Sequence, residues 1–374
     1  MTFSRHDHEC MALALRLAEK GVRTTHPNPR VGCVITQGER IIGQGWHEFA
    51  GGPHAEVVAL QSAGGSKTRG STAYVTLEPC SHHGRTPPCV DALLQAGVAR
   101  VVIATLDPHP VVNGSGRQCL EQAGVRVECG LMAQAAEELN AGFLQRVRKG
   151  RPWVRVKIAT SLDGRTALRN GDSKWISGDD SRRDVQFWRA RSSAILTGIG
   201  TVLADDPALT ARVPEPPLQP LRVIVDTHWR TPPASRVLMQ PATALIAGSE
   251  LEPVPQALRD SGARCLPLPL AGERVDLLSL LQGLAGLEIN EIQVEAGARL
   301  CGALLQASLV DEILWYQAPV LLGEGGPGPF ALGVLESMQD RTHLEVLESC
   351  QVGGDLRLRL RPRSQQSTDH AGGG

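Results

Sequence analysis

The stretch that decides the fold of the first half of the chain is PHAE (residues 53–56), followed by EPCSHHGRTPPC (residues 78–89). It supplies three residues of zinc-ligand type, His54, Cys80 and Cys89, which leave the fourth tetrahedral position of the metal to water. Zinc lowers the pKa of such a water to about 7, so hydroxide is available at neutral pH. Glu56 lies two residues after the histidine, where it can move the proton. The pattern predicts hydrolytic deamination at a Zn2+ site, with Glu56 as the catalytic residue.

The spacing of the motif also predicts where it lies in the secondary structure. Residues two apart on a regular helix point to different sides, so His54 and Glu56 must lie at the beginning of a helix. Pro53 is typical of that position. In nucleobase deaminases two residues separate the cysteines, whereas eight residues separate Cys80 from Cys89 here. We expect this longer loop, residues 81–88, to form a wall of the pocket.

Two histidines between the cysteines leave a structural alternative open. His82 or His83 could complete a site with four protein ligands, and such closed sites stabilise folds rather than catalyse reactions. The chain would then be a binding protein instead of an enzyme. We favour a solvent-facing or substrate-facing position for both side chains.

Two polar residues upstream are candidates for binding a substrate. Asn28 lies in the proline-punctuated segment HPNPRVG (residues 26–32) and offers a donor and an acceptor suited to the edge of a pyrimidine. An asparagine between two prolines is equally well explained as a turn residue. His47, in the segment GWHE (residues 45–48), is a second candidate for the same contact.

Length and charge restrict the class of protein. A chain of 374 residues exceeds what one hydrophobic core usually organises, which predicts two domains. Its 38 Lys+Arg and 39 Asp+Glu leave a net charge of −1, which gives no electrostatic reason to expect nucleic acid or an anionic membrane as partner. The charged N-terminal segment and the absence of a long apolar run predict a cytoplasmic protein. Assembly into a homo-oligomer stays open at this stage.

Strands alternate with helices in the predicted secondary structure of both halves, which indicates an α/β fold with partly parallel sheets. The basic segment RVRKGRP (residues 146–152) follows a predicted helix and is typical of a linker. We therefore place one domain at residues 1–148 and a second at residues 149–362. The tail, residues 363–374, is rich in small and polar residues, and we expect it to be disordered.

Segments from both halves follow one another in an order that matches a known family. They are HPNPRVGCVI (26–35), GGPHAE (51–56), EPCSHHGRTPPC (78–89), VKIATSLDGRTA (156–167), SKWISG (173–178), ILTGIGTVLADDPALTAR (195–212) and VEAGARLCGALL (294–305). Together they resemble the bifunctional deaminase/reductase family of riboflavin biosynthesis. Residues 230–285 and the last fifty residues match no motif of that family.

The resemblance implies two folds and two consecutive reactions. The first domain would be a cytidine-deaminase-like α/β/α sandwich that deaminates 2,5-diamino-6-(5-phosphoribosylamino)pyrimidin-4(3H)-one. The second would be a dihydrofolate-reductase-like α/β domain that uses NADPH to reduce the ribosyl group to ribityl phosphate. The implied partner is thus a phosphorylated pyrimidine, a small molecule.

Residue by residue, the resemblance also implies two sets of contacts in the second domain. The cofactor would be held by Ala159, Trp175, Thr201, Asp205, Thr227 and the turn of Gly297, Ala298, Arg299 and Leu300. The phosphorylated sugar would be held by Ser173, Arg189, Leu209, Arg212 and Glu295, with Lys157 as a further cation facing the phosphate.

The residues of the second half can also be interpreted by themselves. A Rossmann fingerprint is not indicated, because Leu203 stands where the third glycine of the motif would follow Gly198 and Gly200. Gly297 lies between a predicted strand and a predicted helix. Such a position can bind a phosphate, or it can be an ordinary turn. Arg189 and Arg212 suit a bidentate phosphate contact, or else surface ion pairs. No residue stands out as a proton donor.

A second enzymatic hypothesis remains, namely a single-activity zinc nucleobase deaminase with a C-terminal binding module. A polyanionic substrate such as RNA or DNA normally requires a basic surface. The near-neutral charge of the chain disfavours this hypothesis.

Overall fold

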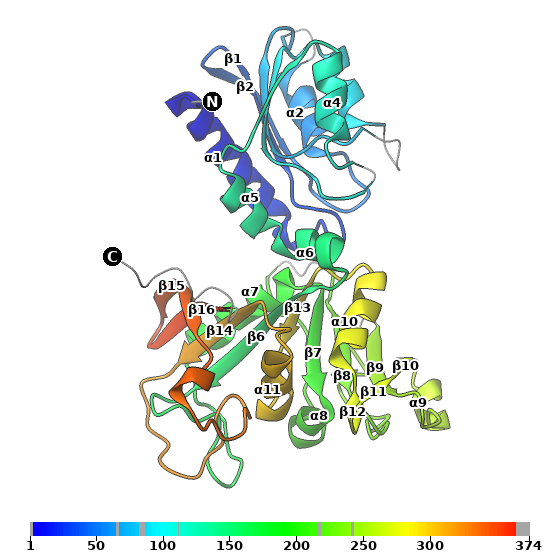
Figure 1. The fold of residues 1–374 in the computed structure, drawn as a ribbon, viewed down its shortest axis with the longest axis vertical. Coiled ribbons are helices and arrows are strands. Elements are labelled where there is room, and N and C mark those ends of the chain that lie inside the picture. Colours follow the sequence, from blue (N-terminus) through cyan, green and yellow to red (C-terminus); the bar gives the residue numbers. More distant parts are fainter. Residues whose placement is uncertain are drawn as a thin grey trace. The chain divides into compact units, whose positions relative to one another are not determined.

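The computed structural model describes residues 3–64, 67–81, 87–110, 112–214, 218–240 and 243–363 of the chain. The chain divides into two compact units, Met1–Arg151 and Pro152–Gly374 (Figure 1). No helix of the described segments is long and apolar enough to cross a membrane. His82 and His83, and the tail after Arg363, lie outside the described residues.

A five-stranded sheet forms the centre of the first unit, in the order β2-β1-β3-β4-β5. β1 runs antiparallel to both β2 and β3, whereas β3, β4 and β5 are parallel. The carboxyl ends of β3 and β4 therefore meet at one edge of the sheet. The strands are β1 (Gly32–Gln37), β2 (Arg40–Trp46), β3 (Thr72–Leu77), β4 (Arg100–Thr105) and β5 (Arg126–Cys129).

Helices cover both faces of this sheet. They are α1 (Arg5–Glu19), the 3-10 helix η1 (Lys20–Arg23), α2 (Ala55–Ala63), α3 (Cys89–Gln95), α4 (Ser115–Gln122), α5 (Ala133–Leu139) and α6 (Ala141–Lys149). Figure 1 shows α1 and α5 on one side of the sheet and α2 and α4 on the other. The strand residues alternate accordingly: Val34, Tyr74 and Val102 pack in the core with α1 and α5, while Ile35 and Val75 pack in the core with α2, α3 and α4. The predicted α/β/α sandwich is confirmed.

A nine-stranded sheet forms the centre of the second unit, in the order β10-β9-β8-β7-β13-β6-β14-β16-β15. The strands from β10 to β14 are parallel, and β16 and β15 continue the sheet antiparallel. Their bounds are β6 (Trp153–Thr160), β7 (Ala194–Gly198), β8 (Leu221–Val225), β9 (Ala244–Ser249), β10 (Arg264–Leu268), β13 (Glu291–Val294), β14 (Glu312–Gln317), β15 (Leu344–Val352) and β16 (Asp355–Pro362). A separate hairpin pairs β11 (Leu270–Ala271) with β12 (Arg274–Val275).

The helices of the second unit lie on both faces of its sheet. They are α7 (Asp179–Arg191), α8 (Ile199–Asp205), α9 (Gln256–Asp260), α10 (Leu277–Gly286) and α11 (Ala298–Gln306), with the 3-10 helix η2 (Met338–Asp340) before β15. Leu196 and its face of the sheet pack with α10 and α11, whereas the neighbouring Ile195 packs with α8 and α9. The crossovers from β7 to α8 and from β13 to α11 begin at the carboxyl edge of the parallel strands, where α/β sheets bind ligands.

The structure defines several elements that no sequence motif marks. The first helix begins at Arg5 because Ser4 caps it: the Asp7 N–H donates to Ser4 Oγ (3.1 Å) and the Ser4 N–H donates to Asp7 Oδ2 (2.8 Å). Residues 230–285, which match no motif, form β9, α9, β10, the β11–β12 hairpin and the start of α10. The last fifty residues supply β15 and β16.

A buried ionic layer joins β6, β13, β14 and β16. Arg155, which is 1% exposed, lies 3.2 Å from Glu312 and 3.4 Å from Glu291, and Arg359 donates to Glu312 at 2.9 Å. The Arg155 guanidinium also lies over the ring of Trp188. Burial alone would raise the pKa of Glu312, but the two arginines outweigh it and lower that pKa to about 2.

The lowered pKa of Glu312 predicts a pH dependence of folding. Since the unfolded carboxyl has a pKa near 4.5, its stabilising contribution is complete above that value and is lost as the pH falls toward 2. Glu312→Gln should lower the free energy of unfolding of the second unit at pH 7 by about 3 kcal/mol, and by less at pH 4. Urea denaturation at the two pH values measures this difference.

Glu345→Gln is the matched control, because Glu345 is an exposed carboxyl on β15. It should leave the stability unchanged at both pH values. An equal loss at pH 7 and pH 4 for Glu312→Gln would contradict the assigned role of its charge.

Candidate functional site

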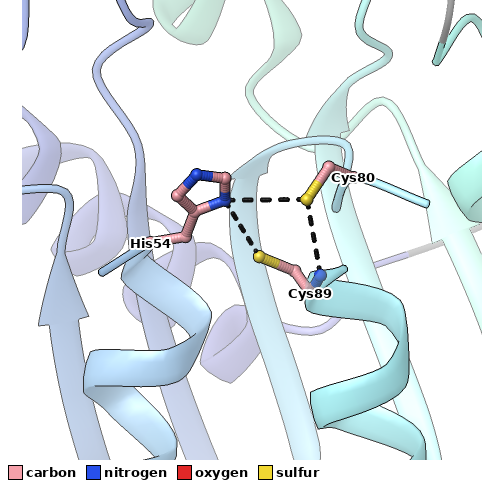
Figure 2. A group of neighbouring side chains, drawn as sticks. All are labelled: His54, Cys80 and Cys89. Carbon is pink, nitrogen blue, oxygen red and sulfur yellow. Dashed lines mark hydrogen bonds between the residues drawn. The ribbon is translucent and has the colours of Figure 1, made fainter. Parts of the chain in front are cut away.

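Three side chains of the first unit converge at one point, as Figure 2 shows. His54 Nδ1 lies 3.1 Å from Cys89 Sγ and 3.6 Å from Cys80 Sγ. All three ligand atoms lie within 4.8 Å of one another. Two sulfurs and one imidazole nitrogen at this spacing fit Zn2+, which accepts both ligand types in tetrahedral sites. Within the described segments the cluster contains these three metal-ligand side chains and no fourth.

Each ligand owes its position to the beginning or end of an element. His54 is the N-cap of α2 and has an extended backbone, with φ −74° and ψ 159°. Its ring therefore projects from the helix start, while Glu56 is already in the first turn, as the two-residue spacing predicted. Cys80 follows the end of β3 by three residues, and Cys89 opens α3 and donates its N–H to Cys80 Sγ at 3.4 Å.

Hydrogen bonds within the cluster favour a thiolate. The contact with Cys89 and, after it, the one with His54 lower the pKa of Cys80 to about 4. The same contact with Cys80, together with burial, raises the pKa of Cys89, so one sulfur shares its proton with the other. A thiolate beside an imidazole is the donor chemistry that a zinc ion requires.

Glu56 is buried beside the ligands, with 3% of its surface exposed. Burial raises the pKa of its carboxyl, and the neighbouring His54 partly opposes that effect. A carboxyl with a raised pKa can both accept and return a proton near neutral pH. The geometry thus gives Glu56 the environment that the predicted general acid/base needs.

The structure brings Asn28 and His47 together next to this cluster. The ring of His47 packs edge-on against that of His54, with centroids 5.4 Å apart. Its Nδ1 lies 3.0 Å from the Pro53 carbonyl and its Nε2 lies 3.0 Å from Asn28 Nδ2. Asn28 also forms a turn, since its N–H donates to Thr25 O at 2.8 Å. The turn alternative for Asn28 is therefore confirmed, and its contact with a substrate stays a prediction.

The hydrogen bonds of His47 fix the orientation of Asn28. The Pro53 carbonyl can only accept, so Nδ1 of His47 carries the hydrogen, and burial lowers the pKa of His47 and keeps the ring neutral. Nε2 must then accept from the Asn28 amide, which leaves the Asn28 carbonyl oxygen to a ligand. His47 is only 3% exposed, so it acts through Asn28 rather than by direct contact with a substrate.

A residue that the sequence analysis missed organises the loop beside Cys80. Glu78, which is 4% exposed, accepts hydrogen bonds from the backbone N–H groups of Asp107 (3.2 Å), Gly114 (3.0 Å) and Arg117 (3.0 Å). Gly116 packs against the same segment, where a Cβ atom would lie 2.0 Å from the Pro79 carbonyl oxygen. One carboxylate therefore joins the carboxyl ends of β3 and β4.

A second contact brings this loop next to the metal ligand. Ser115 Oγ, at the start of α4, lies 2.6 Å from Ser81 Oγ, one residue after Cys80. An acidic residue directly before the Pro-Cys dipeptide was the available signal in the sequence, but its backbone partners lie 29–39 residues away. Sequence spacing could not identify them.

Two cavities open at the carboxyl edge of the second unit's sheet. The α7–α8 cavity has a volume of about 1100 Å3, and the expected ligand-binding residues that line it are Lys157, Ala159, Ser173, Trp175, Arg189, Thr201, Asp205, Leu209, Arg212, Glu295, Gly297 and Ala298. The α10–α11 cavity has a volume of about 1330 Å3 and is lined by Thr201, Asp205, Thr227, Gly297, Ala298, Arg299 and Leu300 from the same set. The two cavities share Thr201, Asp205, Gly297 and Ala298 and are therefore adjacent.

The bidentate edge of Arg189 faces a carboxylate of the protein. Its Nε and Nη2 each donate to Glu295 at 2.7 Å, and its Nη1 donates to the Thr210 carbonyl at 3.0 Å. Burial alone would raise the pKa of Glu295, but Arg189 lowers it to about 2. The fork that was expected to bind phosphate is thus already engaged, which leaves Arg212, exposed at the cavity, as the better placed guanidinium.

Lys157 lies beside this ion pair on β6. Burial lowers the pKa of its ammonium group, Glu295 opposes that effect, and Arg189 adds to it. The charge of Glu295 therefore acts on Lys157, and the expected contact of Lys157 with a phosphate stays a prediction. The sequence analysis found no proton donor, and a lysine with a lowered pKa at the cavity supplies a candidate.

The remaining expected cofactor contacts surround the start of α11 and the segment before α7. Gly297 is the N-cap of α11, so the first backbone N–H groups of that helix face the cavities without helical partners. Trp175 is 70% exposed and packs under the guanidinium of Arg182, and the adjacent Lys174 pairs with Asp205 at 3.4 Å. A helix N-terminus at the junction of two adjacent cavities fits the phosphates of a dinucleotide.

The contacts of Glu78 predict that its charge stabilises the first unit. Glu78→Gln replaces one acceptor oxygen by a donor that faces backbone N–H groups, so the free energy of unfolding should fall by about 2 kcal/mol. Denaturant unfolding measures this loss. The exposed Glu39, in the turn between β1 and β2, is the control: Glu39→Gln should change the stability by less than about 0.5 kcal/mol. Equal stabilities of the two variants would contradict the role assigned to Glu78.

Two protein-family models match the chain. The model of the cytidine and deoxycytidylate deaminase zinc-binding region matches residues 4–105, and the model of the RibD C-terminal domain matches residues 152–358. The second match covers the part of the chain that the alternative hypothesis had assigned to a binding module.

Relatives and solved structures cover nearly the whole length. The riboflavin biosynthesis protein RibD of Escherichia coli is 49% identical over 366 residues, covering 95% of this chain and 99% of the relative. The protein of the same name from Haemophilus influenzae is 43% identical, covering 97% and 99%. The solved structure of Acinetobacter baumannii RibD superposes with a TM-score of 0.90 at 45% identity, covering 96% of this chain and 99% of that one.

A third solved structure carries a fuller description. It is a diaminohydroxyphosphoribosylaminopyrimidine deaminase/5-amino-6-(5-phosphoribosylamino)uracil reductase from Thermotoga maritima, with a TM-score of 0.85 at 34% identity and coverage of 96% and 99%.

Proposed function

Because the chain belongs to the RibD family, the bifunctional deaminase/reductases of riboflavin biosynthesis, we propose specific roles for its residues in two consecutive reactions. The first unit deaminates 2,5-diamino-6-(5-phosphoribosylamino)pyrimidin-4(3H)-one with Zn2+. The second reduces the ribosyl group of the product to ribityl phosphate with NADPH. The observation that carries the assignment is the meeting of His54, Cys80 and Cys89 beside the buried carboxyl of Glu56.

The three metal ligands and Glu56 have different roles in deamination. His54, Cys80 and Cys89 hold the zinc ion, which when bound lowers the pKa of a water molecule and so supplies the nucleophile. Glu56 accepts a proton from the attacking water and delivers it to the departing amine. Burial raises the pKa of its carboxyl, which favours uptake of the proton from water.

Asn28 orients the pyrimidine next to Glu56. Its amide is fixed by His47, so its carbonyl oxygen accepts a hydrogen bond from an N–H at the edge of the ring. A fixed acceptor selects for a base that carries a donor at that edge, since a base without one would leave the carbonyl without a partner. Closed binding of zinc by four protein ligands, as in a structural site, is not supported by the described cluster of three.

The adjacent cavities of the second unit support the reductase roles. Arg212 and Ser173 bind the sugar phosphate in the α7–α8 cavity, with Leu209 and the Arg189–Glu295 pair forming its wall. Ala159 and Trp175 in the α7–α8 cavity, with Thr201 and Asp205 at the junction of the cavities, contact the nicotinamide half of the cofactor, and Thr227 with residues 297–300 contacts the rest. NADPH, when bound, supplies the hydride.

Lys157 and Glu295 handle the proton of the reduction. Reduction of the anomeric carbon would form a C–H bond there and break its bond to the ring oxygen, so the ring oxygen would have to gain a proton. Lys157 can donate one because burial lowers the pKa of its ammonium group, and Glu295 holds that group beside the sugar. Arg189 in turn fixes Glu295 through two hydrogen bonds.

The partners and the location of the enzyme follow from the two proposed reactions. Both substrates are small molecules, and the net charge of −1 offers no general affinity for nucleic acid or anionic membranes. A cytoplasmic location suits an enzyme of coenzyme biosynthesis that consumes NADPH.

The role of Glu56 predicts a selective loss. Glu56→Gln retains the size of the side chain but cannot take up a proton, so ammonia release should fall by at least about a hundredfold. Zinc content should stay unchanged, and NADPH oxidation with the deaminated substrate should persist. A glutamate dehydrogenase-coupled assay measures the ammonia. A variant that deaminates at the normal rate would remove Glu56 from the mechanism.

The role of Arg212 predicts the opposite selectivity. Arg212→Ala should raise the KM of the reductase for its phosphorylated substrate by about tenfold, because one charge-assisted phosphate contact is lost. Ammonia release should not change. Arg259→Ala, which removes an exposed arginine of α9 outside both cavities, should alter neither reaction. If the Arg212→Ala variant lost deaminase and reductase activity to a similar extent, the cause would be misfolding instead of lost phosphate binding.

A further inference from the structure

Asn140 lies at the junction of α5 and α6 in the first unit, and only 2% of its surface is exposed. Its backbone belongs to both helices, because its N–H donates to Ala136 O at 3.2 Å and its carbonyl accepts from the Leu144 N–H at 2.9 Å. Asparagine is a preferred N-cap residue, yet this side chain does not cap α6. A buried amide needs hydrogen-bond partners, so those of Asn140 must lie elsewhere.

The partner of this amide is the backbone of Arg30, 110 positions earlier in the chain. Asn140 Oδ1 accepts from the Arg30 N–H at 2.8 Å, and Asn140 Nδ2 donates to the Arg30 carbonyl at 2.8 Å. One side chain thus binds both polar groups of one residue, as a paired residue on a neighbouring antiparallel strand would. The two hydrogen bonds fix the position and the orientation of the backbone at Arg30.

The side chain of Arg30 strengthens the same connection. Its Nη1 donates to the Leu139 carbonyl at 2.7 Å, directly before Asn140, and its Nη2 donates to the Val22 carbonyl of η1 at 3.4 Å. The whole residue is buried. Arg30 is therefore held to the α5–α6 junction by its backbone and by its guanidinium.

Asn28 lies two residues before Arg30, between two fixed points of the backbone. Upstream, its N–H donates to Thr25 O at 2.8 Å. Downstream, Arg30 is fixed by Asn140. Its side-chain amide lies 3.0 Å from His47 Nε2. His47 thus sets the orientation of the amide, whereas the two backbone points set where the amide lies.

Apolar contacts hold α6 against the strand that leads to the metal ligands. Phe143 and Leu144 of α6 form a buried cluster with Leu77, the last residue of β3, and Val31 packs against it. Cys80 follows Leu77 by three residues. These contacts do not involve the amide of residue 140, so its removal should leave the packing of α6 and the metal site in place.

We propose that Asn140 is a positioning residue of the deaminase, which acts through the backbone of Arg30 to place the Asn28 amide against the pyrimidine. This inference rests on the proposed contact of Asn28 with the substrate. Asn140 lies outside residues 4–105, the part of the chain that the deaminase family model matches. The pyrimidine site therefore depends on the α5–α6 junction as well as on the zinc-binding region.

Steady-state kinetics of the full chain provides the first readout. Asn140→Ala removes both hydrogen bonds to Arg30 and should raise the KM for the diamino substrate by about tenfold, with kcat changed by less than about twofold. Zinc content and NADPH oxidation with the deaminated substrate should not change. Gln134→Ala, which removes an exposed amide of α5, is the control and should alter none of these quantities.

A double-mutant cycle with Asn28 separates positioning from general stability. If Asn140 acts through Asn28, its loss matters only while the Asn28 amide is present. Asn28→Ala should lower kcat/KM of deamination by itself, and adding Asn140→Ala should lower it further by less than about twofold. A merely structural effect would lower kcat/KM by its full factor in both backgrounds.

Asn140→Asp provides a variant of the same size whose effect depends on pH. Its carboxylate can accept from the Arg30 N–H but cannot donate to the Arg30 carbonyl, whereas the protonated carboxyl can do both. Burial raises the pKa of such a carboxyl. The KM of the variant, divided by that of the wild type at the same pH, should therefore fall as the pH is lowered.

The outcomes separate this inference from the proposed function. An unchanged KM in Asn140→Ala, loss of zinc from both Asn140 variants, or full additivity with Asn28→Ala overturns the positioning role. If Asn28→Ala deaminates like the wild type, the positioning role falls together with the contact of Asn28, while ammonia release by the wild type leaves the deaminase function intact. A wild-type chain that releases no ammonia from the diamino substrate overturns the proposed function itself.

Discussion

The deaminase half depends on one constraint: an imidazole and two sulfurs, delivered by three separate elements, must meet within bonding reach of a single metal ion. The start of α2 carries His54, the segment after β3 carries Cys80, and the start of α3 carries Cys89. The starts of α2 and α3 and the segment after β3 lie together because parallel strands place their carboxyl ends at the same edge of a sheet. The same meeting point buries Glu56, and burial raises the pKa of its carboxyl. Metal binding and proton transfer therefore share one structural cause.

The second unit uses the carboxyl edge of a sheet for another purpose. Seven parallel strands bring α7, α8 and the N-terminus of α11 around two adjoining cavities. In the α7–α8 cavity, Arg189 holds the carboxylate of Glu295 through two hydrogen bonds, and the charge of Glu295 also acts on Lys157.

The parts of the site that could be predicted from sequence are those set by local spacing. The two-residue step from His54 to Glu56 requires a helix start, and the structure has one there. The partners of Glu78 and the ion pair between Arg189 and Glu295 could not be predicted, because residues 29–39 and 106 positions apart come together only through the sheet order. β16 carries a signal that was overlooked: in DLRLRLRP (355–362) leucine and arginine alternate with the period of a strand. Its arginines match acids on other strands, which a single segment does not reveal.

The most direct test of the account is the coordination of the metal. X-ray absorption at the zinc edge, on chain purified after growth with sufficient zinc, measures the number and type of ligands. The account predicts about one zinc ion per chain, bound by two sulfurs, one imidazole nitrogen and one exchangeable oxygen from solvent. A chain without zinc, or a site closed by a fourth protein ligand, would contradict the proposal that this metal activates water for deamination.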